Sequence, residues 1–264
     1  MTNAEYHGHP AISKSSLFKL KESPEKFRYY MDHPQPKTPS LIFGSALHKW
    51  ALEPDGFFSE FAVAPEIDRR TKSGREKWEA FNAENAGLEI ISLEELQTIH
   101  LMVDSLFKNK YARTLIKSSR HEQSFFWTDE LTGEECKCRP DILLDSLHII
   151  ADLKSCESAE TDSFMRDAIK YGYHLQSFMY TDGVRHNTGN TYQFVFIAVE
   201  KKPPYAVNIM QADELFIRYG EDTFRELIGI YHECRETGNW WGYNGFTGMI
   251  NSLGLPPYLA KEYQ

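Results

Sequence analysis

The chain has 264 residues, of which 41% are hydrophobic and 25% are charged, and its formal net charge is −9. These are the values of a soluble globular protein with a sizeable core, built as one large domain or two small ones. The net charge argues against a protein that coats nucleic acid by bulk attraction, so any contact with DNA has to be local. No signal-peptide pattern and no long apolar stretch is present, so we expect a cytoplasmic protein without a membrane partner.

The N-terminal part is predicted to be mainly helical. Ser13 and the pair Ser23-Pro24 are typical helix starts. Residues Leu41–Leu52 predict a short helix in which Gly44 and His48 lie one turn apart on one face. Glycine inside a helix costs roughly 1 kcal/mol relative to alanine, and a close backbone approach would explain it. Taken alone, a histidine on such an apolar helix is more often a hydrogen-bonded core residue than a metal ligand.

The one dense basic stretch runs from Arg69 to Lys77 and reads RRTKSGREK. Ser73 and Glu76 form a capping-box pattern, which predicts a helix continuing through Trp78 and Phe81. A basic loop at a helix N-terminus could grip phosphates. A solvated surface turn explains the same residues equally well.

Three adjacent antiparallel strands are predicted over His121–Thr128, Glu134–Leu144 and Leu147–Lys154, the last two joined by a short polar link. The other predicted elements are an edge strand over Phe57–Val63, a helix capped by Ser92, helices over Ser158–Ile169, Tyr173–Val184 and Ala212–Glu236, and strands over Thr191–Val199 and Tyr205–Met210.

Two carboxylates and one ammonium group converge if the last two strands of this meander form a hairpin. Asp152 and Lys154 are two residues apart, so strand alternation points both side chains to one face. Asp141 then falls roughly level with them on the neighbouring strand. Such oxygen ligands can hold Mg²⁺, and the lysine can orient a water or meet developing negative charge. A surface ion pair on an exposed hairpin explains the pattern about as well.

The four cysteines are Cys136, Cys138, Cys156 and Cys234. No C-x-x-C pair is present, so structural thiols are favoured over a zinc or iron–sulfur site.

The order of the motifs resembles the PD-(D/E)xK nuclease superfamily and, within it, nuclease domains of the exonuclease VIII type. The motifs that carry the resemblance are AISKSSLFKL, FGSALHKWALEP, VAPEIDRRTKSGREKWEAF, CKCRPD, DLKS and YHLQSFMYTDG. Individually they are weak, but together, in the family's order over most of the chain, they are specific.

The resemblance implies a role for individual residues. The implied metal ligands are His48, Glu122, Asp141, Asp152 and the carbonyl of Leu153. The implied catalytic group consists of Asp141, Asp152 and Lys154, supported by Gln176 and Tyr180 from a helix that also contacts DNA. The preferred contacts to the DNA backbone are Arg69, Arg70, Lys72 and Arg75.

The resemblance also implies an α/β fold, with a central mixed β-sheet flanked by helices and an N-terminal helical extension. We expect a single nuclease domain over 1–264, with the helical part carrying His48 in 1–118, the catalytic sheet in 119–211 and a helix with its tail in 212–264. The implied activity is Mg²⁺-dependent 5′→3′ digestion of linear duplex DNA with two ions per site, for which Mn²⁺ can substitute. It releases 5′-mononucleotides and leaves 3′ single strands. The implied partners are further copies in a toroidal tetramer and a single-strand-annealing protein.

Three other interpretations remain. An iron–sulfur or helicase-linked nuclease is disfavoured, because only Cys234 lies near the C-terminus and no phosphate-binding loop is present. An endonuclease of the same superfamily would be distinguished by its action on circular DNA. A non-catalytic DNA-binding module is disfavoured because the Asp141, Asp152 and Lys154 pattern is intact.

Overall fold

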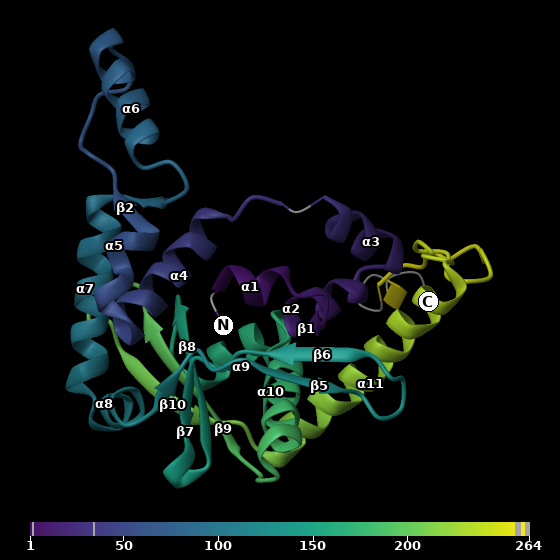
Figure 1. Cartoon of the computed structure of the whole chain (residues 1–264). Helices are drawn as coiled ribbons and strands as arrows, with labels where there is room; N and C mark the ends of the chain where they lie inside the picture. Colours follow the sequence, from purple (N-terminus) through teal and green to yellow (C-terminus); the bar gives the residue numbers. More distant parts are fainter. Residues whose placement is uncertain (2, 34, 257–259, 262–264) are drawn as a thin grey trace.

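The computed structural model describes residues 1, 3–33, 35–256 and 260–261 (Figure 1). The predicted tail over 212–264 therefore falls partly on 257–259 and 262–264, outside the described residues. The α-helices of the described residues are α1 (Asn3–Gly8), α2 (Lys14–Leu17), α3 (Pro24–Asp32), α4 (Pro39–Leu52), α5 (Phe57–Glu60), α6 (Lys72–Glu84), α7 (Leu93–Lys108), α8 (Lys110–Lys117), α9 (Thr161–Lys170), α10 (Tyr173–Thr188) and α11 (Glu214–Thr237). Short 3₁₀ turns are η1 (Phe18–Lys21), η2 (Pro54–Gly56) and η3 (Asp145–Leu147).

The strands form three sheets. A five-stranded mixed sheet has the order β10 (Val207–Gln211), β9 (Gln193–Glu200), β8 (Ile149–Cys156), β7 (Ile142–Leu144) and β4 (Arg120–His121). A three-stranded sheet has the order β1 (Ile12–Ser13), β6 (Glu135–Cys138) and β5 (Phe125–Thr128), and a pair joins β2 (Phe61–Val63) to β3 (Glu89–Ile91). In the five-stranded sheet β8 and β9 are parallel, so the chain crosses between them through α9 and α10. The predicted mixed sheet flanked by helices is confirmed.

The five-stranded sheet is covered on both faces. On one face, Leu47 of α4 and Ile99 of α7 pack with Leu153 of β8 in one apolar cluster. On the other face, Ile150 of β8 joins Phe164 of α9 in a second cluster. Because side chains alternate along a strand, Asp152 and Lys154 leave β8 on the same face as Ile150, toward α10. The sheet therefore presents its polar residues to the helix that follows the crossover.

Several predicted helix starts are confirmed. Ser23 accepts a hydrogen bond from the backbone N–H of Lys26 at 3.2 Å, and Pro24 takes the first helical position of α3. Ser92 and Glu95 form a reciprocal capping box at the start of α7. These caps satisfy backbone donors that a helix leaves free at its N-terminus.

The meander is broken where the sequence predicted continuous strands. The stretch predicted over His121–Thr128 splits into β4 and β5, which belong to different sheets, and the one over Glu134–Leu144 splits into β6 and β7. Pro140 explains the second break, because proline has no N–H to donate to a strand ladder. Glu122 explains the first: its φ of 52° lies in the left-handed region and turns the chain between sheets.

Three smaller predictions are wrong in detail. Phe57–Glu60 is a helical turn, so only Phe61–Val63 of the predicted edge strand is a strand. Thr71, rather than Ser73, caps α6, accepting a hydrogen bond from the N–H of Gly74 at 3.0 Å. A Cβ at Gly44 would meet nothing within 4 Å among the described residues, so the expected close approach there is absent.

The cysteine thiols are free and buried. Cys136 and Cys138 belong to the apolar cluster between β6 and α10, which includes Leu175 and Met179. In the described part of the chain, no helix is both long and apolar enough to cross a lipid bilayer.

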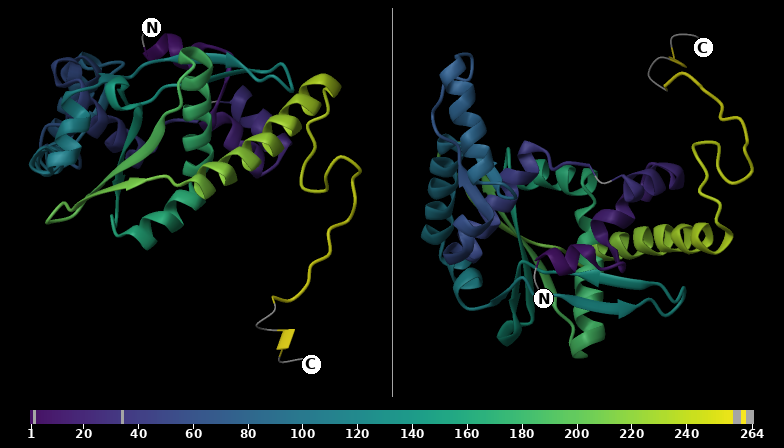
Figure 2. Two further views of the ribbon diagram at one scale, coloured as in Figure 1. Left: turned by 90° about the horizontal axis from the view of Figure 1, so that it is seen from below. Right: turned by 45° about the horizontal axis from the view of Figure 1, so that its top comes forward.

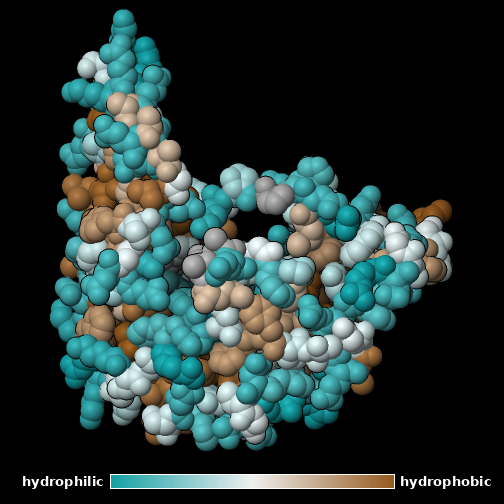
Figure 3. Space-filling model, in the orientation of Figure 1, coloured by the Kyte–Doolittle hydropathy of each residue, from teal (hydrophilic) through white to brown (hydrophobic). Residues whose placement is uncertain are grey.

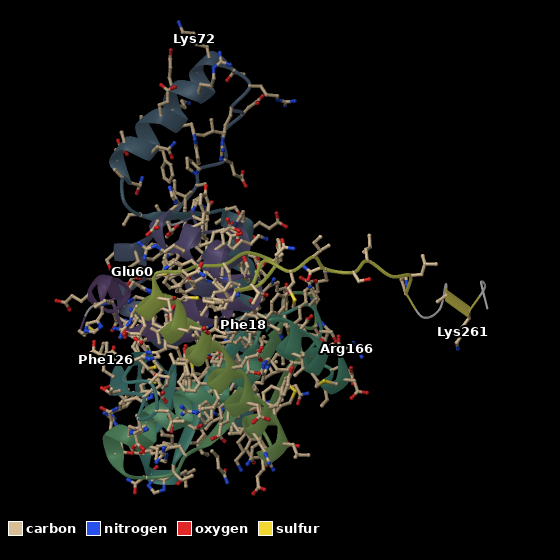
Figure 4. The ribbon with its side chains drawn as sticks, turned by 90° about the vertical axis from the view of Figure 1, so that its right-hand side faces the viewer. Phe18, Glu60, Lys72, Phe126, Arg166 and Lys261 are labelled. Carbon is tan, nitrogen blue, oxygen red and sulfur yellow. The ribbon has the colours of Figure 1, made fainter. Side chains whose placement is uncertain are left out.

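α6 projects from the rest of the chain (Figure 1). We call residues 64–88 the α6 arm. In Figure 4 its labelled Lys72 lies at the tip, far from the sheets. The loop at the tip is compact, because a Cβ at Gly74 would lie 2.0 Å from the carbonyl oxygen of Asp68.

Helices α10 and α11 approach each other closely at Gly220. A Cβ at this position would lie 2.0 Å from the carbonyl oxygen of His174, a backbone atom that cannot move without displacing α10. Gly229, further along α11, has nothing within 4 Å of its Cβ position. The two glycines therefore provide a matched pair on one helix.

We expect Gly220→Ala to destabilise the fold by about 1–3 kcal/mol through overpacking. Gly229→Ala should stabilise it by up to about 1 kcal/mol, because alanine is the better helix former. Urea unfolding followed by circular dichroism measures both. Stabilisation of the chain by Gly220→Ala would show that the close approach of the helices is absent.

Candidate active site

The register of β7 against β8 brings the two predicted carboxylates together. The strands are antiparallel with Ile142 opposite Ala151, so Asp141 stands opposite Asp152 one step further along. Asp141 Oδ2 accepts a hydrogen bond from the backbone N–H of Leu153 at 2.8 Å. The convergence predicted from the hairpin is therefore present in the structure.

Asp152 is almost completely buried and is held by two neighbours. The Nζ atom of Lys154 lies 2.5 Å from its Oδ2 atom, and the side-chain amide of Gln176 donates a hydrogen bond to Oδ1. Lys154 Nζ also lies 4.7 Å from the centre of the Tyr173 ring, a cation–π contact. Gln176 and Tyr173 both come from the first turn of α10, so this helix fixes the catalytic candidates of β8.

His48 and Glu122 reach the same place from other elements. One ligand atom each of His48, Glu122 and Asp141 lies within 4.8 Å of the other two. His48 Nδ1 is 3.4 Å from Asp141 Oδ2. Glu122 was predicted from a strand that does not exist at that position; the left-handed turn between β4 and β5 brings it here instead.

Burial and like charge set the protonation of this group. Burial raises the pKa of Glu122, and the negative charge of Asp141 raises it further, to about 8. Burial acts to lower the pKa of His48, but Asp141 outweighs it and raises that pKa to about 9. Burial and Asp141 together raise the pKa of Asp152, whereas the nearby Asp152 raises the pKa of Lys154 against its burial. Protonation of Glu122 and His48 therefore offsets the negative charge of the carboxylates, a role that a bound cation would take over.

These residues fit a hard divalent cation. Carboxylate oxygens are the ligands that Mg²⁺ and Mn²⁺ prefer, and one imidazole is acceptable to Mn²⁺. Asp152 Oδ2 is buried beside the ammonium of Lys154, at 2.5 Å, and accepts no hydrogen bond from any other described residue, so a second lone pair of this oxygen is available to such an ion. His48 would have to lose its proton to become a ligand, so binding would release a proton.

Leu153 and Tyr180 are two further residues of the predicted site. Leu153 contributes its backbone N–H to Asp141, and its side chain is buried in the sheet core. Tyr180 lies one turn after Gln176 on α10 and lines the same cleft, and burial raises the pKa of its phenol. Both therefore sit at the predicted site.

The four basic residues predicted to contact DNA lie away from the carboxylates, on the α6 arm. Arg69 stacks on the Trp78 ring at 3.4 Å, and Arg70 pairs with Asp68 at 3.0 Å. The Nζ atom of Lys72 lies 3.9 Å from Oε1 of Glu76, and the guanidinium of Arg75 donates a hydrogen bond to the backbone carbonyl of Arg70. The tip of the arm is hydrophilic in Figure 3. The side chains of Arg70 and Lys72 are 92% and 87% exposed, so both are accessible to a large ligand.

An open cleft of about 1060 Å³ leads to the site. The floor carries His48, Glu122, Asp141 and Lys154. One wall is formed near the start of the chain, by Met1, Tyr6, His7 and Ser13 to Ser15. Lys137 holds this wall: its ammonium donates to the carbonyls of Tyr6 at 2.6 Å and His9 at 2.7 Å.

Lys14 is a cleft residue that sequence reasoning missed. Its ammonium donates to the carbonyl of Tyr171 at 2.6 Å, and it lines the cleft that also holds Lys154. Burial, followed by the positive charge of Lys154, lowers the pKa of Lys14 to about 7. The motif AISKSSLFKL contained this lysine, but only the parallel pairing of β1 with β6 brings it near β8.

No curated protein matches the chain. Among solved structures, a candidate exonuclease from Eubacterium rectale superposes with a TM-score of 0.66 at 14% identity, covering 97% of this chain and 96% of the other. A phage-related exonuclease from Haemophilus somnus 129PT, at 15% identity, covers 90% of this chain and 100% of the other with a TM-score of only 0.36.

The first of these similarities shows a shared fold. Residues 13–252 match a family described as "PDDEXK-like domain of unknown function (DUF3799)". The matched region contains every site residue predicted from the sequence, whereas the start of the cleft wall, with Met1 and Tyr6, lies outside it. The chain therefore belongs to this family of PDDEXK-like domains.

Proposed function

We propose that the chain is a metal-dependent exodeoxyribonuclease that degrades linear duplex DNA in the 5′→3′ direction. The observation that carries the proposal is the convergence of Asp141, Asp152 and Lys154 at one point of an open cleft, with Gln176 on Asp152. The exonuclease description of the E. rectale structure supports it. Release of 5′-mononucleotides and a 3′ single-stranded product are parts of the same proposal.

The proposed roles follow from the contacts. Asp141 and Asp152, with His48, Glu122 and the carbonyl of Leu153, would hold two Mg²⁺ ions, for which Mn²⁺ can substitute. When bound, such ions lower the pKa of a coordinated water and offset charge on the scissile phosphate. Lys154, a compact positive charge beside Asp152, would orient the attacking water or stabilise the developing charge.

Gln176 and Tyr180 of α10 are proposed to support the catalytic residues. Gln176 fixes the Asp152 carboxylate by donating to Oδ1, which leaves Oδ2 for Lys154 and a cation. Tyr180 lines the cleft beside Gln176, where it can contact the substrate backbone. Burial of Asp152 removes competing water, which strengthens each of these interactions.

Arg69, Arg70, Lys72 and Arg75 are proposed to contact the DNA backbone. Their exposed charges at the end of a projecting arm can reach a duplex that enters the cleft from outside. A local basic surface of this kind reconciles DNA binding with a net charge of −9.

The proposed assembly is a homo-oligomer, a toroidal tetramer around the duplex, that hands its 3′ strand to a single-strand-annealing protein. This part rests on the resemblance to exonuclease VIII-type domains. A closed ring would keep an acidic protein on DNA by topology rather than by charge.

Linear duplex DNA labelled at either the 5′ or the 3′ end tests the activity directly. With Mg²⁺, we expect early loss of the 5′ label as mononucleotide, no release with EDTA, and an intact closed circle. Asp152→Asn should reduce the rate at least about 100-fold, since it removes charge at the centre of the site. Asp182→Asn, a buried carboxylate on α10 that pairs with Arg185, is the matched control.

Other results of this assay contradict the proposal in different ways. A cut circle would show an endonuclease, and early loss of the 3′ label would reverse the polarity. Absence of any Mg²⁺-dependent release, with DNA still bound, would show a binding module.

Metal binding has its own readout in thermal stability. Because carboxylates repel one another in the folded state, Mn²⁺ should raise the melting temperature by roughly 5–10 °C at a hundredfold excess over its dissociation constant. Asp141→Asn should abolish most of this rise. Glu53→Gln removes a carboxylate that lines the cleft outside the cluster and should preserve it. Equal rises in both variants would place the ion elsewhere.

Lys14 should contribute to DNA affinity. Its ammonium has three donors, of which Tyr171 takes one, and it faces the cleft. At pH 6, below the lowered pKa of about 7 of Lys14 and therefore with its ammonium charged, Lys14→Gln should weaken binding to duplex DNA about tenfold and reduce the slope of log Kd against log salt by about one. Fluorescence anisotropy in EDTA measures this without cleavage.

Lys19→Gln, the same charge change on an exposed lysine of η1 outside the cleft, is the control for Lys14. Identical losses in the two variants would show only a general effect of net charge.

A further inference from the structure

The segment after α11 differs in composition from the rest of the chain. Residues 238–260 contain no Asp, Glu, Lys or Arg, although 25% of all residues are charged. The segment is rich in glycine, asparagine and large apolar residues instead. The segment therefore lacks the basic side chains with which proteins neutralise the phosphates of nucleic acids or bind anionic lipids.

The first residues of this segment are anchored to the body. Trp240 stacks on Phe27 of α3, with ring centres 5.4 Å apart, and the carbonyl of Trp241 accepts a hydrogen bond from the N–H of Glu25 at 3.0 Å. Further along, Asn244 and Asn251 donate to the carbonyls of Met249 and Tyr243, so these hydrogen bonds stay within the segment. The segment is therefore attached to the rest of the chain at Trp240 and Trp241, which we call its root, and the residues that follow project away from the fold.

The remainder exposes apolar side chains. Ile250 and Leu253 are 96% and 101% exposed, and Met249 and Leu255 are 70% and 58% exposed. Burial of each such side chain would stabilise the protein by about 1.5–3 kcal/mol. In Figure 2 this stretch runs away from the sheets and helices, and in Figure 3 brown side chains mark the right-hand edge where it begins. We call residues 246–255 the C-terminal arm.

An open groove lies beside the root of the arm. It has a volume of about 410 Å³ between η1, α3 and α11, and its walls include Leu20, Pro24, Tyr219 and Ile230. Trp241 and Tyr243, which lead into the arm, already line one side. The groove therefore offers apolar walls to the side chains of the arm, and charged residues line it as well: Lys21, Glu22, Asp222 and Glu226.

We propose that the C-terminal arm of one copy docks into the groove of a second copy. The hydrogen bonds of Asn244 and Asn251 close the first part of the arm into a loop, and the four residues after Asn251 reach about 13 Å further when extended, enough to enter a groove on an adjoining copy. An uncharged arm can join two copies that each carry −9 without adding to their repulsion. Exchange of equivalent segments through equivalent grooves is an economical route to a closed homo-oligomer. The inference rests on the homo-oligomer proposed above, but not on the nuclease activity.

Paired substitutions in the full chain test the docking. Ile250→Asp with Leu253→Asp should shift the mass measured by light scattering from the oligomer to the 30.6 kDa monomer. Because both side chains are fully exposed in the single chain, the fold of each subunit should be unchanged, and the circular dichroism spectrum of the variant should match that of the wild type. Leu131→Asp, at a leucine that is 79% exposed in the β5–β6 turn, is the control and should leave the oligomer intact.

Cysteine crosslinking identifies the receptor. The native thiols are buried, so Leu253→Cys and Tyr219→Cys each introduce one accessible thiol. Mixing the two variants under mild oxidation should give a covalent dimer containing one chain of each.

The outcomes separate this inference from the proposals on which it rests. A monomeric wild-type chain would overturn the assembly and the docking together, whatever the nuclease assay shows. An oligomer that survives the paired aspartates, or a mixture that forms no mixed dimer, would overturn the docking alone.

Discussion

Two buried carboxylates face each other across β7 and β8, and much of the surrounding structure offsets their repulsion. Coulomb energy is far larger in the interior than in water, so such a pair persists only when each member has its own partners. Asp141 has His48 and the N–H of Leu153; Asp152 has Lys154 and Gln176. These partners come from α4, β8 and α10. The need for partners to both charges explains why helices distant in sequence converge on one point of the sheet, between the interior strands β7 and β8.

The part of the site that lies within one hairpin could be predicted from the sequence. Strand alternation fixes the common face of Asp152 and Lys154, and antiparallel pairing fixes the level of Asp141. Helix periodicity likewise places Gln176 and Tyr180 on one face of α10. These are short-range consequences of regular backbone geometry. The structure confirms the hairpin register and the positions of the long helices, although α10 continues to Thr188, beyond the predicted end at Val184.

The remaining features depend on irregular backbone and long-range pairing. Pro140 was a visible signal that the strand would break, but the left-handed turn at Glu122 has no comparable signature, since glutamate seldom adopts it. Lys14 reaches the cleft only because β1 pairs with β6, more than 120 residues later. The cap at Thr71 was missed because Gly74 allows the loop to close two residues earlier than the Ser73 pattern suggested. Local propensity cannot report such contacts.

The attachment of the first residues by Lys137 divides the molecule into parts of unequal local stability. α1 has six residues and is held by hydrogen bonds from Lys137, by the buried Tyr6 ring and by a two-residue strand, whereas the five-stranded sheet is covered by apolar clusters on both faces. Local opening in proteins follows the weakest cooperative unit. Opening of the cleft wall should therefore cost less free energy than opening of the sheet, so the amide protons of the wall should exchange faster than those of β8. The entrance of the cleft can therefore widen without unfolding the strand that carries Asp152 and Lys154.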